Sequence, residues 1–504
     1  MDLSGWIGHR AAWSPDQVAL HFDGEDVTYA ALASRVRRLA DALASVLGVA
    51  RGDRVAHLGF NSPGVLELLF ACARLGAMLV PLNWRLAPAE HAAILADAEP
   101  AAVFVEPALE AALGPALAAR PELRVVRCRA GDHAALLGDA PPAAAAGAPE
   151  APVLLVYTSG TTGRPKGALL TQEALLYNAL NGIAAHQMTA ADHVLTVLPM
   201  FHVGGLNIHT TPALYAGATV TIARRFDAGD TLRLIGARRP TLLLTVPTVA
   251  QALAEHPAFP ATDLGSLRLM ATGAQVVPEA VIRPWLAHGV PVVQVYGLTE
   301  SGPTAIALPL ADAWRKPTAC GLPALHTEAR IAAADGGEAP RGQRGEIQLR
   351  GPNLTAGYWR NAEATRLAFT GGWFHTGDVG HQDAEGYFYV DDRQKDVVIT
   401  GGENVYPAEL EQVLADCPAI AEAAVVGRPD ARWGEVPVAC VVLRPGAGLD
   451  GAGVLALFEG RVARFKHPRD VVFLDTLPRT AMGKVQKFEL RDRLRGAAAP
   501  APDG

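Results

Sequence analysis

Short apolar runs alternate with segments of helical period through most of the first 300 residues. After Thr28, the run YAALASRVRRLADALASVLG places Ala and Leu on one helical face and Arg on the other. It is followed by DRVAHLGF, typical of a short strand, by GVLELLFACARLGA, typical of a helix, and by MLVPL, a second strand. Strands that alternate with helices predict βαβ units around a parallel sheet, so the pattern places the chain in the α/β class.

The alternation continues and then changes. AAVFVE, LRVVRC and PVLLVY repeat the buried-strand pattern, and after an Ala- and Pro-rich loop VLTVLP, ATVTIA, TLLLTV and VVQVYG resume it. From Gly345, short strands and Gly turns predict a distorted antiparallel barrel. The helix PAELEQVLADC then opens about a hundred residues that are typical of a small α+β domain. A chain of 504 residues is too long for one ordinary core, so at least two domains are expected.

Composition excludes several classes of protein. Half of the residues are hydrophobic and 19% are charged, which fits a globular chain. The net charge of −7 offers no excess of cations for a nucleic-acid backbone. Five cysteines without CxxC spacing argue against a disulfide framework or a zinc site and fit a reducing compartment. Residues 1–15 lack the apolar stretch of a signal peptide, and no apolar run approaches the ~18 residues that span a bilayer. We expect a cytoplasmic protein without a transmembrane segment.

A loop rich in Gly, Thr and Ser follows the apolar strand 153–157. Glycines let backbone N–H groups approach a polyphosphate, hydroxyls donate hydrogen bonds and a lysine adds a cation. The loop is not a Walker A motif, because Pro165 precedes the lysine and Gly167 follows it. A flexible turn would explain any three of these residues but not all of them together. The predicted phosphate-binding residues are Thr158, Ser159, Gly160, Thr161, Thr162, Gly163 and Lys166.

The run YTSGTTGRPKG resembles the signature of the adenylate-forming superfamily of acyl-CoA synthetases, luciferases and nonribosomal-peptide adenylation domains. The resemblance extends from Thr28 to about Lys487 and is strongest to fatty-acyl or aryl acid–CoA ligases. It implies ATP, Mg²⁺ and CoA as cofactors, and two half-reactions: formation of an acyl-adenylate, then transfer of the acyl group to a thiol. It also implies a large N-terminal domain (1–391) of two doubly wound α/β subdomains plus a distorted β-barrel, a hinge (392–396), a small mobile α+β domain (397–495) and a disordered tail (496–504).

Two turns at strand ends are candidates for nucleotide contacts. After VVQV, Glu300 suits Mg²⁺, a hard cation that takes carboxylate and phosphate oxygens. The resemblance implies that Thr299 contacts the α-phosphate and that Tyr296, before Gly297, stacks on adenine. A helix N-cap at Thr299 is the alternative. By resemblance, the turn after LRLMAT passes beside the adenine and the acyl pocket; its residues are Gly273, Ala274 and Gln275.

The next motifs lie near the predicted hinge. Asp378 follows a Gly turn, and an acceptor-only side chain can hold both ribose hydroxyls. The resemblance implies this role for Asp378, with Arg393 as the second residue that contacts the ribose. The alternative is that Asp378 is structural, as an Asp in a turn more often is. By resemblance, Lys395 is the hinge residue, and a solvated linker is compatible with that role. The loop at Gly402 is implied to line the pantetheine tunnel.

Four residues are candidates for a direct part in catalysis: Thr299 and Glu300, described above, and Lys484 and His202. By resemblance, Lys484 bridges the acid's carboxylate and the α-phosphate, where an ammonium neutralises the charge that develops during adenylation. His202 precedes a Val-Gly-Gly stretch. The resemblance suggests an aromatic gate between the acyl pocket and the thiol tunnel, and a hydrogen-bonded core histidine is an equal alternative.

Aromatic and basic residues bear on the thiol acceptor. Phe465 offers a ring for the CoA adenine, and Lys466 and Arg469 offer cations for its phosphates. The resemblance adds Arg85 as a phosphate contact. The alternative to CoA binding is that these are ordinary basic residues on an exposed helix end. Relatives that load carrier proteins commonly have an extra insertion in the large domain; its absence here favours free CoA. An acyl-AMP ligase that loads a carrier protein and a non-catalytic scaffold remain alternatives, as do monomer and dimer.

The segments expected to wall the acid pocket are small or apolar. They are Val203–Leu206, Gly273–Ala274 and Tyr296–Pro303, and their only charge, Glu300, is assigned to Mg²⁺. Malonate-type relatives carry Arg where this chain has Val295. A second carboxylate buried without a partner would lose several kcal/mol. We therefore expect a monocarboxylic acid with an apolar tail, medium-to-long fatty or aryl, rather than acetate, malonate or an amino acid.

Overall fold

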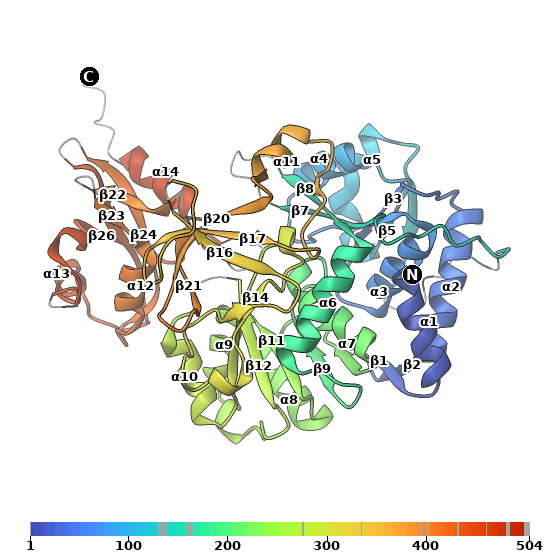
Figure 1. Cartoon of the computed structure of the whole chain (residues 1–504), viewed down its shortest axis with the longest axis horizontal. Coiled ribbons are helices and arrows are strands. Elements are labelled where there is room, and N and C mark those ends of the chain that lie inside the picture. Colours follow the sequence, from blue (N-terminus) through green and yellow to red (C-terminus); the bar gives the residue numbers. More distant parts are fainter. Residues whose placement is uncertain are drawn as a thin grey trace. The chain divides into compact units, whose positions relative to one another are not determined.

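The computed structural model describes residues 2–129, 133, 138, 140–158, 165–274, 277–333, 335–393, 396–400, 403–430, 433–459, 461–479 and 484–497. The chain divides into two compact units. Unit 1 comprises residues 1–274, 285–329 and 348–375, and unit 2 comprises residues 275–284, 330–347 and 376–504. Figure 1 labels the elements of both. The architecture is mixed α/β, with a large N-terminal and a small C-terminal domain.

The first sheet of unit 1 has seven strands in the order β18-β8-β7-β4-β3-β5-β6. Five of them pair in parallel, as the alternating sequence predicts, and two are antiparallel additions. Helix α2 begins where the Thr28 side chain accepts a hydrogen bond from the backbone N–H of Ala31. The strands are β3 (Arg54–Leu58), β4 (Met78–Pro81), β5 (Ala102–Val105), β6 (Arg124–Arg127), β7 (Pro152–Thr158), β8 (Lys166–Thr171) and β18 (Gly357–Tyr358); the helices of this part are α1 (Ser4–Trp13), α2 (Tyr29–Ser45), α3 (Pro63–Leu75), α4 (Pro88–Ala98), α5 (Gly114–Ala119) and α11 (Ala362–Ala368).

The second sheet of unit 1 has nine strands in the order β15-β14-β13-β12-β11-β9-β10-β1-β2. Its middle strands are parallel and almost entirely buried, which explains why they read as continuous apolar runs. The strands are β1 (Val18–Phe22), β2 (Glu25–Thr28), β9 (His193–Thr196), β10 (Thr219–Ile222), β11 (Leu242–Thr245), β12 (Leu269–Gly273), β13 (Val292–Tyr296), β14 (Ile306–Ala307) and β15 (Leu322–Pro323); the helices are α6 (Gln172–His186), α7 (Thr210–Ala216), α8 (Ala228–Arg238) and α9 (Pro247–Ala254). Helix α10 (Glu279–Ala287) begins in unit 2 and ends in unit 1.

The stretch predicted as a distorted barrel forms a five-stranded sheet. Its order is β16-β17-β20-β19, with β21 paired to β20. Strand β20 alternates buried and half-buried residues, the period of a sheet with one covered face. The strands are β16 (Glu328–Ala332), β17 (Gly345–Arg350), β19 (Phe369–Thr370), β20 (Trp373–Gln382) and β21 (Phe388–Arg393).

The C-terminal part of unit 2 is the small α+β domain that the sequence predicts. Its sheet follows the order β23-β22-β25-β24, and β26 pairs with β25. Two hydrophobic clusters pack on this sheet, one with α12 and α13 and one with α14. The strands are β22 (Val398–Thr400), β23 (Glu403–Val405), β24 (Ile420–Asp430), β25 (Gly434–Leu443) and β26 (Asp470–Phe473); the helices are α12 (Pro407–Ala415), α13 (Gly451–Ala456) and α14 (Lys487–Ala497).

The division into units does not coincide with the predicted domain bounds. Unit 2 begins its long final segment at residue 376, so the predicted hinge (392–396) lies inside it. Asp392 accepts a hydrogen bond from the backbone N–H of Ala408 (3.0 Å), and Asp396 pairs with Arg491 (2.7 Å). Lys395 lies outside the described residues, and the hinge stays a prediction. Helix α14 continues two residues into the predicted tail (496–504), whose last seven residues are also outside the described part.

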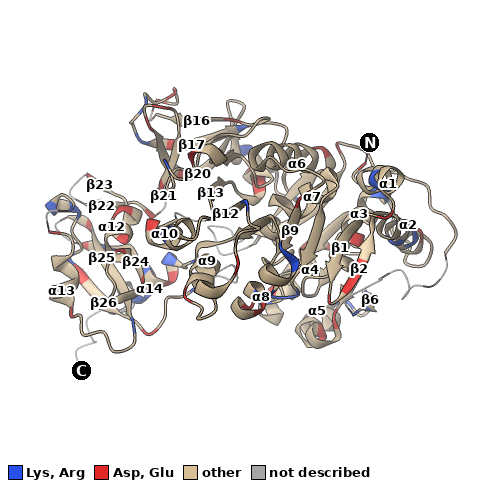
Figure 2. Ribbon diagram, turned by 90° about the horizontal axis from the view of Figure 1, so that it is seen from below, with Lys and Arg blue, Asp and Glu red and all other residues tan. Residues whose placement is uncertain are grey.

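The distribution of charged residues and the hydropathy of the helices are the last features of the fold. Lysine and arginine are interspersed with aspartate and glutamate along the ribbons of both units (Figure 2). In the described part of the chain, no helix combines the length and the apolar character needed to cross a membrane.

Candidate active site

The ends of the predicted phosphate loop lie on β7 and β8, which pair antiparallel. Thr158 and Lys166 lie opposite each other at its base, and the Thr158 hydroxyl donates to the Lys166 carbonyl oxygen (3.4 Å). The loop residues between them, Ser159, Gly160, Thr161, Thr162 and Gly163, lie outside the described residues. This pairing therefore brings the first and last members of the predicted loop together at the end of a buried strand.

Strand β18 adds a residue that the sequence did not suggest. The Tyr358 hydroxyl donates to Glu300 Oε1 (2.9 Å), and the Lys166 ammonium lies 5.6 Å from the centre of the Tyr358 ring. Burial, followed by the charge of Glu300 and their hydrogen bond, raises the pKa of Tyr358 well above its ordinary value. Only the pairing of β18 with β8 places Tyr358 here. No local sequence signal marks Tyr358, because its position depends on this pairing.

The turn after β13 carries Thr299 and Glu300, which are both buried. It is a single turn of three residues, Thr299–Ser301, so it does not begin the longer helix that the N-cap alternative requires. The Ser301 hydroxyl accepts from the backbone N–H of Leu298 (2.9 Å) and fixes the turn. Gly297 is necessary here, because a Cβ would lie 1.7 Å from the Pro303 carbonyl oxygen.

The neighbouring turn after β12 lies beside the same strand. Gly273 is the parallel partner of Val295, and a Cβ on Gly273 would lie 2.1 Å from the Val295 carbonyl oxygen. Ala274 has a positive φ of 74°, an uncommon conformation for a residue with a Cβ. Gln275 lies outside the described residues. The structure thus brings the Gly273 and Tyr296 turns together at the carboxyl end of adjacent strands, the edge where α/β sheets bind ligands.

His202 precedes a π-helical turn, Gly204–Ile208, a geometry that is frequent at functional sites. The backbone N–H of Gly204 donates to His202 Nδ1 (3.0 Å), so in the neutral ring the proton is on Nε2. A Cβ on Gly204 would meet only the His202 ring within 4 Å outside its own turn. The atoms nearest to that position are therefore those of the His202 ring, and the gate stays a prediction.

In unit 2, Asp378 and Arg393 are direct partners across β20 and β21. Asp378 is buried, and its backbone N–H donates to the Thr376 hydroxyl (3.0 Å). Gly377 has a φ of +69°, which glycine adopts readily and other residues rarely do. The backbone thus places the two predicted ribose contacts side by side.

The remaining predicted residues of unit 2 are less completely described. Lys484 follows a stretch outside the described part, beside an antiparallel bridge between Arg479 and Val485. Gly402 lies outside the described residues, between β22 and β23, where Thr400 pairs with Glu403.

The aromatic and basic cluster predicted for CoA is spread over both units. In unit 2, Phe465 is exposed, and Arg469 lies over the ring of Trp433 (5.8 Å), a residue that sequence reasoning did not single out. Lys466 binds both carboxylate oxygens of Glu409 (2.7 and 2.8 Å), so its charge is already paired. In unit 1, Arg85 lies over the Trp84 ring (4.7 Å).

Comparisons with known proteins agree with this architecture. Residues 7–359 match the model of the AMP-binding enzyme family, and residues 409–484 match that of the AMP-binding enzyme C-terminal domain. Indoleacetate–CoA ligase of Aromatoleum aromaticum is 50% identical over 97% of this chain and 98% of its own length. A feruloyl-CoA synthase of Amycolatopsis is 42% identical over 97% and 99%. ATP-bound MatB of Rhodopseudomonas palustris superposes with a TM-score of 0.91 at 34% identity, over 99% of this chain and all of that one.

The fold and these matches define an adenylate-forming enzyme, and the chain belongs to the AMP-binding enzyme family. It is an ATP-dependent acid–CoA ligase of the AMP-forming type, which uses a carboxylic acid, ATP with Mg²⁺, and CoA.

Proposed function

We propose that this enzyme activates an aromatic monocarboxylic acid and transfers its acyl group to CoA. One observation carries the choice of acid: the two relatives reported above act, by their names, on indoleacetate and on a feruloyl group, both of them aromatic. The pocket segments agree with an apolar tail. No Lys or Arg occurs in residues 203–206, 273–274 or 296–303.

In the first half-reaction, the acid's carboxylate attacks the α-phosphorus of ATP and pyrophosphate leaves. We assign Thr158–Lys166 to the β- and γ-phosphates, where backbone N–H groups and the Lys166 ammonium stabilise the leaving pyrophosphate. Thr299 donates to the α-phosphate, and Tyr296 with Gly273–Gln275 holds the adenine. Asp378 and Arg393 hold the ribose. Lys484 neutralises the charge that grows between carboxylate and phosphate.

Glu300 fits a divalent cation. It is a buried carboxylate that, among the described residues, has a hydrogen bond from Tyr358 but no ion-pair partner. Carboxylate and phosphate oxygens are the ligands that Mg²⁺ prefers. When bound, Mg²⁺ would neutralise phosphate charge, and the Tyr358 hydroxyl would hold Glu300 in the orientation that binds it.

In the second half-reaction, the CoA thiol attacks the acyl carbon and AMP leaves. We assign His202 to the passage between the acid pocket and the thiol, and Gly402 to the wall of the pantetheine tunnel. Phe465, Arg469 and Arg85 are assigned to the nucleotide end of CoA, with the hinge at Lys395. Lys466 contributes less, because Glu409 pairs its charge. We also place the enzyme in the cytoplasm, which suits the free cysteines of the described chain.

A panel of acids tests the proposal. Indoleacetate, a cinnamate, octanoate, acetate and malonate would be compared by the kcat/KM of CoA-dependent AMP formation. The proposal expects the highest values from the two aromatic acids. A highest value for acetate or malonate would overturn it, and release of pyrophosphate without an acyl-CoA product would favour a carrier-protein acceptor.

A further inference from the structure

Two histidines and a cysteine lie together in the interior of unit 1. His57 is in strand β3, Cys128 directly follows strand β6, and His133 is five residues further along the chain. Each offers one ligand atom, a ring nitrogen or the sulfur, and these three atoms all lie within 4.8 Å of one another. All three residues are buried, with exposed fractions of 3%, 1% and 1%. In the part of the chain that the structure describes, no other His, Cys, Asp and Glu residues form such a group.

The parallel sheet directs two of these side chains to one face. His57 is paired with Phe104 of β5, and Phe104 is paired with Val126 of β6. Paired residues on adjacent strands point to the same side of a sheet, and so do residues two apart along one strand. Cys128 lies two residues after Val126, and its backbone N–H donates to the Val105 carbonyl oxygen (2.9 Å), which continues the pairing of β6 with β5. His57 and Cys128 therefore lie on the same face, near the carboxyl ends of their strands.

Helix α3 and strand β5 hold the third ligand in place. The backbone N–H of His133 donates to Oε2 of Glu67, a buried residue of α3 (3.2 Å). The centre of the His133 ring lies 5.4 Å from that of Phe104 and 6.0 Å from that of His57. A backbone hydrogen bond and a ring contact thus position His133 over the face of the sheet that carries the other two ligands.

Two glycines make room for the imidazole rings. A Cβ on Gly64, at the start of α3, would lie 1.9 Å from His133 Cε1 and 2.5 Å from each of its ring nitrogens. A Cβ on Gly59 would lie 2.7 Å from His57 Cε1 and 2.9 Å from its Nε2. Any larger residue at these positions would displace a ring, because a close-packed interior has no space to absorb such an overlap. The backbone thus approaches both imidazoles as closely as glycine permits.

Two imidazole nitrogens and one thiol are a ligand set that suits zinc. Zn²⁺ binds ring nitrogens and thiolate sulfur in tetrahedral geometry, whereas Mg²⁺ and Ca²⁺ take oxygen ligands. A Zn–N bond of about 2.0–2.1 Å and a Zn–S bond of about 2.3 Å place ligand atoms about 3.4–3.6 Å apart. The limit of 4.8 Å on the separation of the three atoms is only slightly wider, so small side-chain rotations bring them to this distance. As the S–Zn bond forms, the Cys128 thiol releases its proton to solvent, and a water fills the fourth position.

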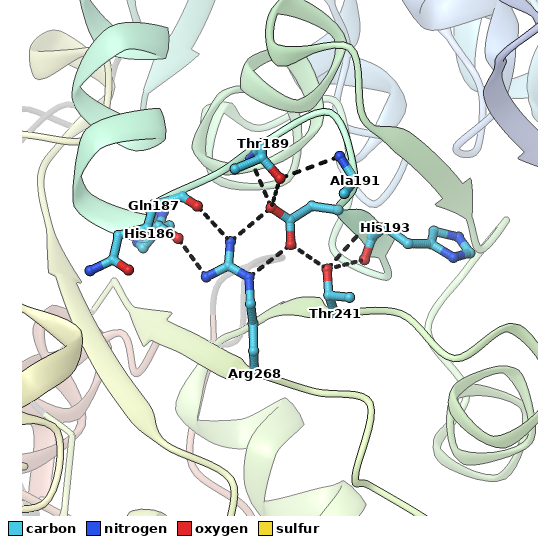
Figure 3. Close-up of polar contacts among 8 residues, drawn as sticks. His186, Gln187, Thr189, Ala191, His193, Thr241 and Arg268 are labelled. Atoms are coloured by element: carbon cyan, nitrogen blue, oxygen red, sulfur yellow. Dashed lines mark hydrogen bonds and ion pairs between the residues drawn. The ribbon is translucent and has the colours of Figure 1, made fainter.

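A second pair of buried histidines in unit 1 lacks these properties. The rings of His186 and His209 meet edge to face, with centres 4.6 Å apart. The Arg268 guanidinium donates to the His186 carbonyl oxygen (2.7 Å) and pairs with Asp192 (2.7 Å) (Figure 3). Among the described residues this pair has no third ligand, and the neighbouring guanidinium is a fixed positive charge that repels a metal ion. Burial of two histidines is therefore not sufficient for a metal site, and this pair provides a control.

We propose that His57, Cys128 and His133 form a structural zinc site that holds the chain after β6 against the carboxyl end of the first sheet. CxxC spacing detects ligands that come in local pairs, whereas here the sheet brings His57 to Cys128 from far along the chain. None of the three residues is among those that we assign to ATP, the acid or CoA. Zinc bound here stabilises the folded chain, because unfolding separates the ligands.

Metal analysis of the full-length, untagged protein tests the site. Protein loaded with Zn²⁺ would be dialysed against buffer with excess Mg²⁺, and its zinc content measured by mass spectrometry for the wild type, Cys128→Ser and His57→Phe. Thermal unfolding with and without a chelator would be followed in parallel. Cys72→Ser and His186→Phe are the matched controls, because Cys72 is a fully buried free cysteine and His186 a fully buried histidine, both outside the cluster.

The wild type and both controls should retain about one zinc ion per chain, and the chelator should lower their Tm. Cys128→Ser and His57→Phe should bind zinc at least about 100-fold more weakly, because loss of a ligand costs more than the ~10–100-fold that follows loss of a group behind a ligand. The chelator should leave the Tm of these two variants unchanged.

Should the two cluster variants not fold, X-ray absorption spectroscopy of the zinc-loaded wild type decides. It should show one sulfur at about 2.3 Å from the metal and nitrogens at about 2.0–2.1 Å. Loss of zinc from the wild type during dialysis, a metal without a sulfur neighbour, or equal zinc contents in the cluster and control variants overturns the site.

Discussion

The hydroxyl of Tyr358 donates a hydrogen bond to Glu300 Oε1 across 2.9 Å. The two residues are far apart in the sequence and meet because β18 pairs with β8 next to the turn after β13. The hydrogen bond orients a buried carboxylate that we assign to Mg²⁺, so Tyr358 acts through Glu300 and is a positioning residue.

Tyr358→Phe should therefore weaken the binding of Mg²⁺ rather than abolish activity. Loss of a group that orients a metal ligand typically costs about 10–100-fold in metal affinity. The Mg²⁺ concentration for half-maximal pyrophosphate release should rise by about that factor, with little change in the KM for the acid. Tyr389→Phe, which removes a hydroxyl bonded to Asp383 in unit 2, serves as the control. An unchanged Mg²⁺ titration would contradict the role of Tyr358.

Lys484→Ala should separate the two half-reactions. Loss of one group that stabilises transition-state charge costs about 10²–10³-fold, so adenylation should fall by at least that factor. Thioester formation from preformed acyl-AMP should be much less affected. The acid's carboxylate charge, which Lys484 neutralises during adenylation, is no longer present in acyl-AMP. Rapid-quench measurement of each half-reaction distinguishes the outcomes, and an equal loss in both would refute the assignment.

Lys395→Pro should impair CoA transfer more than adenylation. Proline fixes φ near −65° and hinders the rotation that the predicted hinge requires. Acyl-AMP formation should persist, provided that the fixed arrangement is the adenylating one. Overall turnover equal to that of the wild type would show that the chain does not rotate at this residue.

Acid should destabilise unit 1 through its buried histidines. Burial, with lesser contributions from neighbouring positive charges, lowers the pKa of His186 to about 4 and that of His209 well below its ordinary value. Between pH 6.5 and pH 4 the unfolded chain binds protons that the folded chain does not, so stability falls as the pH falls. Each histidine should contribute about 1.4 kcal/mol per pH unit in this window.

Urea unfolding of unit 1 between pH 7 and pH 5, followed by near-UV circular dichroism, measures this dependence. His186→Phe should remove the contribution of one histidine and make the decline shallower. A midpoint that does not change over this range, or a slope that the substitution leaves as it was, would contradict the neutral state of these rings.

The sheets and the turns at their strand ends could be predicted from the sequence because their signals are local. A parallel strand buried on both faces is a continuous apolar run, and Gly273 and Gly297 mark close backbone approaches at strand ends. Tyr358 could not be found in this way, since its importance comes from strand pairing far along the chain. The contact between the buried rings of His186 and His209 was missed for the same reason, because nothing near His186 in the sequence indicates His209.

The partners of charged side chains also could not be predicted from the sequence. Lys466 looked like a free cation for a phosphate, yet its ammonium binds Glu409, 57 residues earlier on α12. Conversely, Arg469 has an aromatic partner in Trp433 that belongs to a different loop. Which charges are available to a ligand depends on these tertiary partners and not on residue type.

The glycines of the segments that we propose as the wall of the acid pocket differ in which substitutions they permit. Gly205, Gly273 and Gly297 each face a carbonyl oxygen that a Cβ would approach to 2.3 Å or less. Gly204 faces only the edge of an imidazole, 3.2 Å away at its nearest atom. A mutant library designed to alter acid selectivity should therefore randomise position 204 and leave the other three as glycine, because at those three any side chain would collide with the backbone.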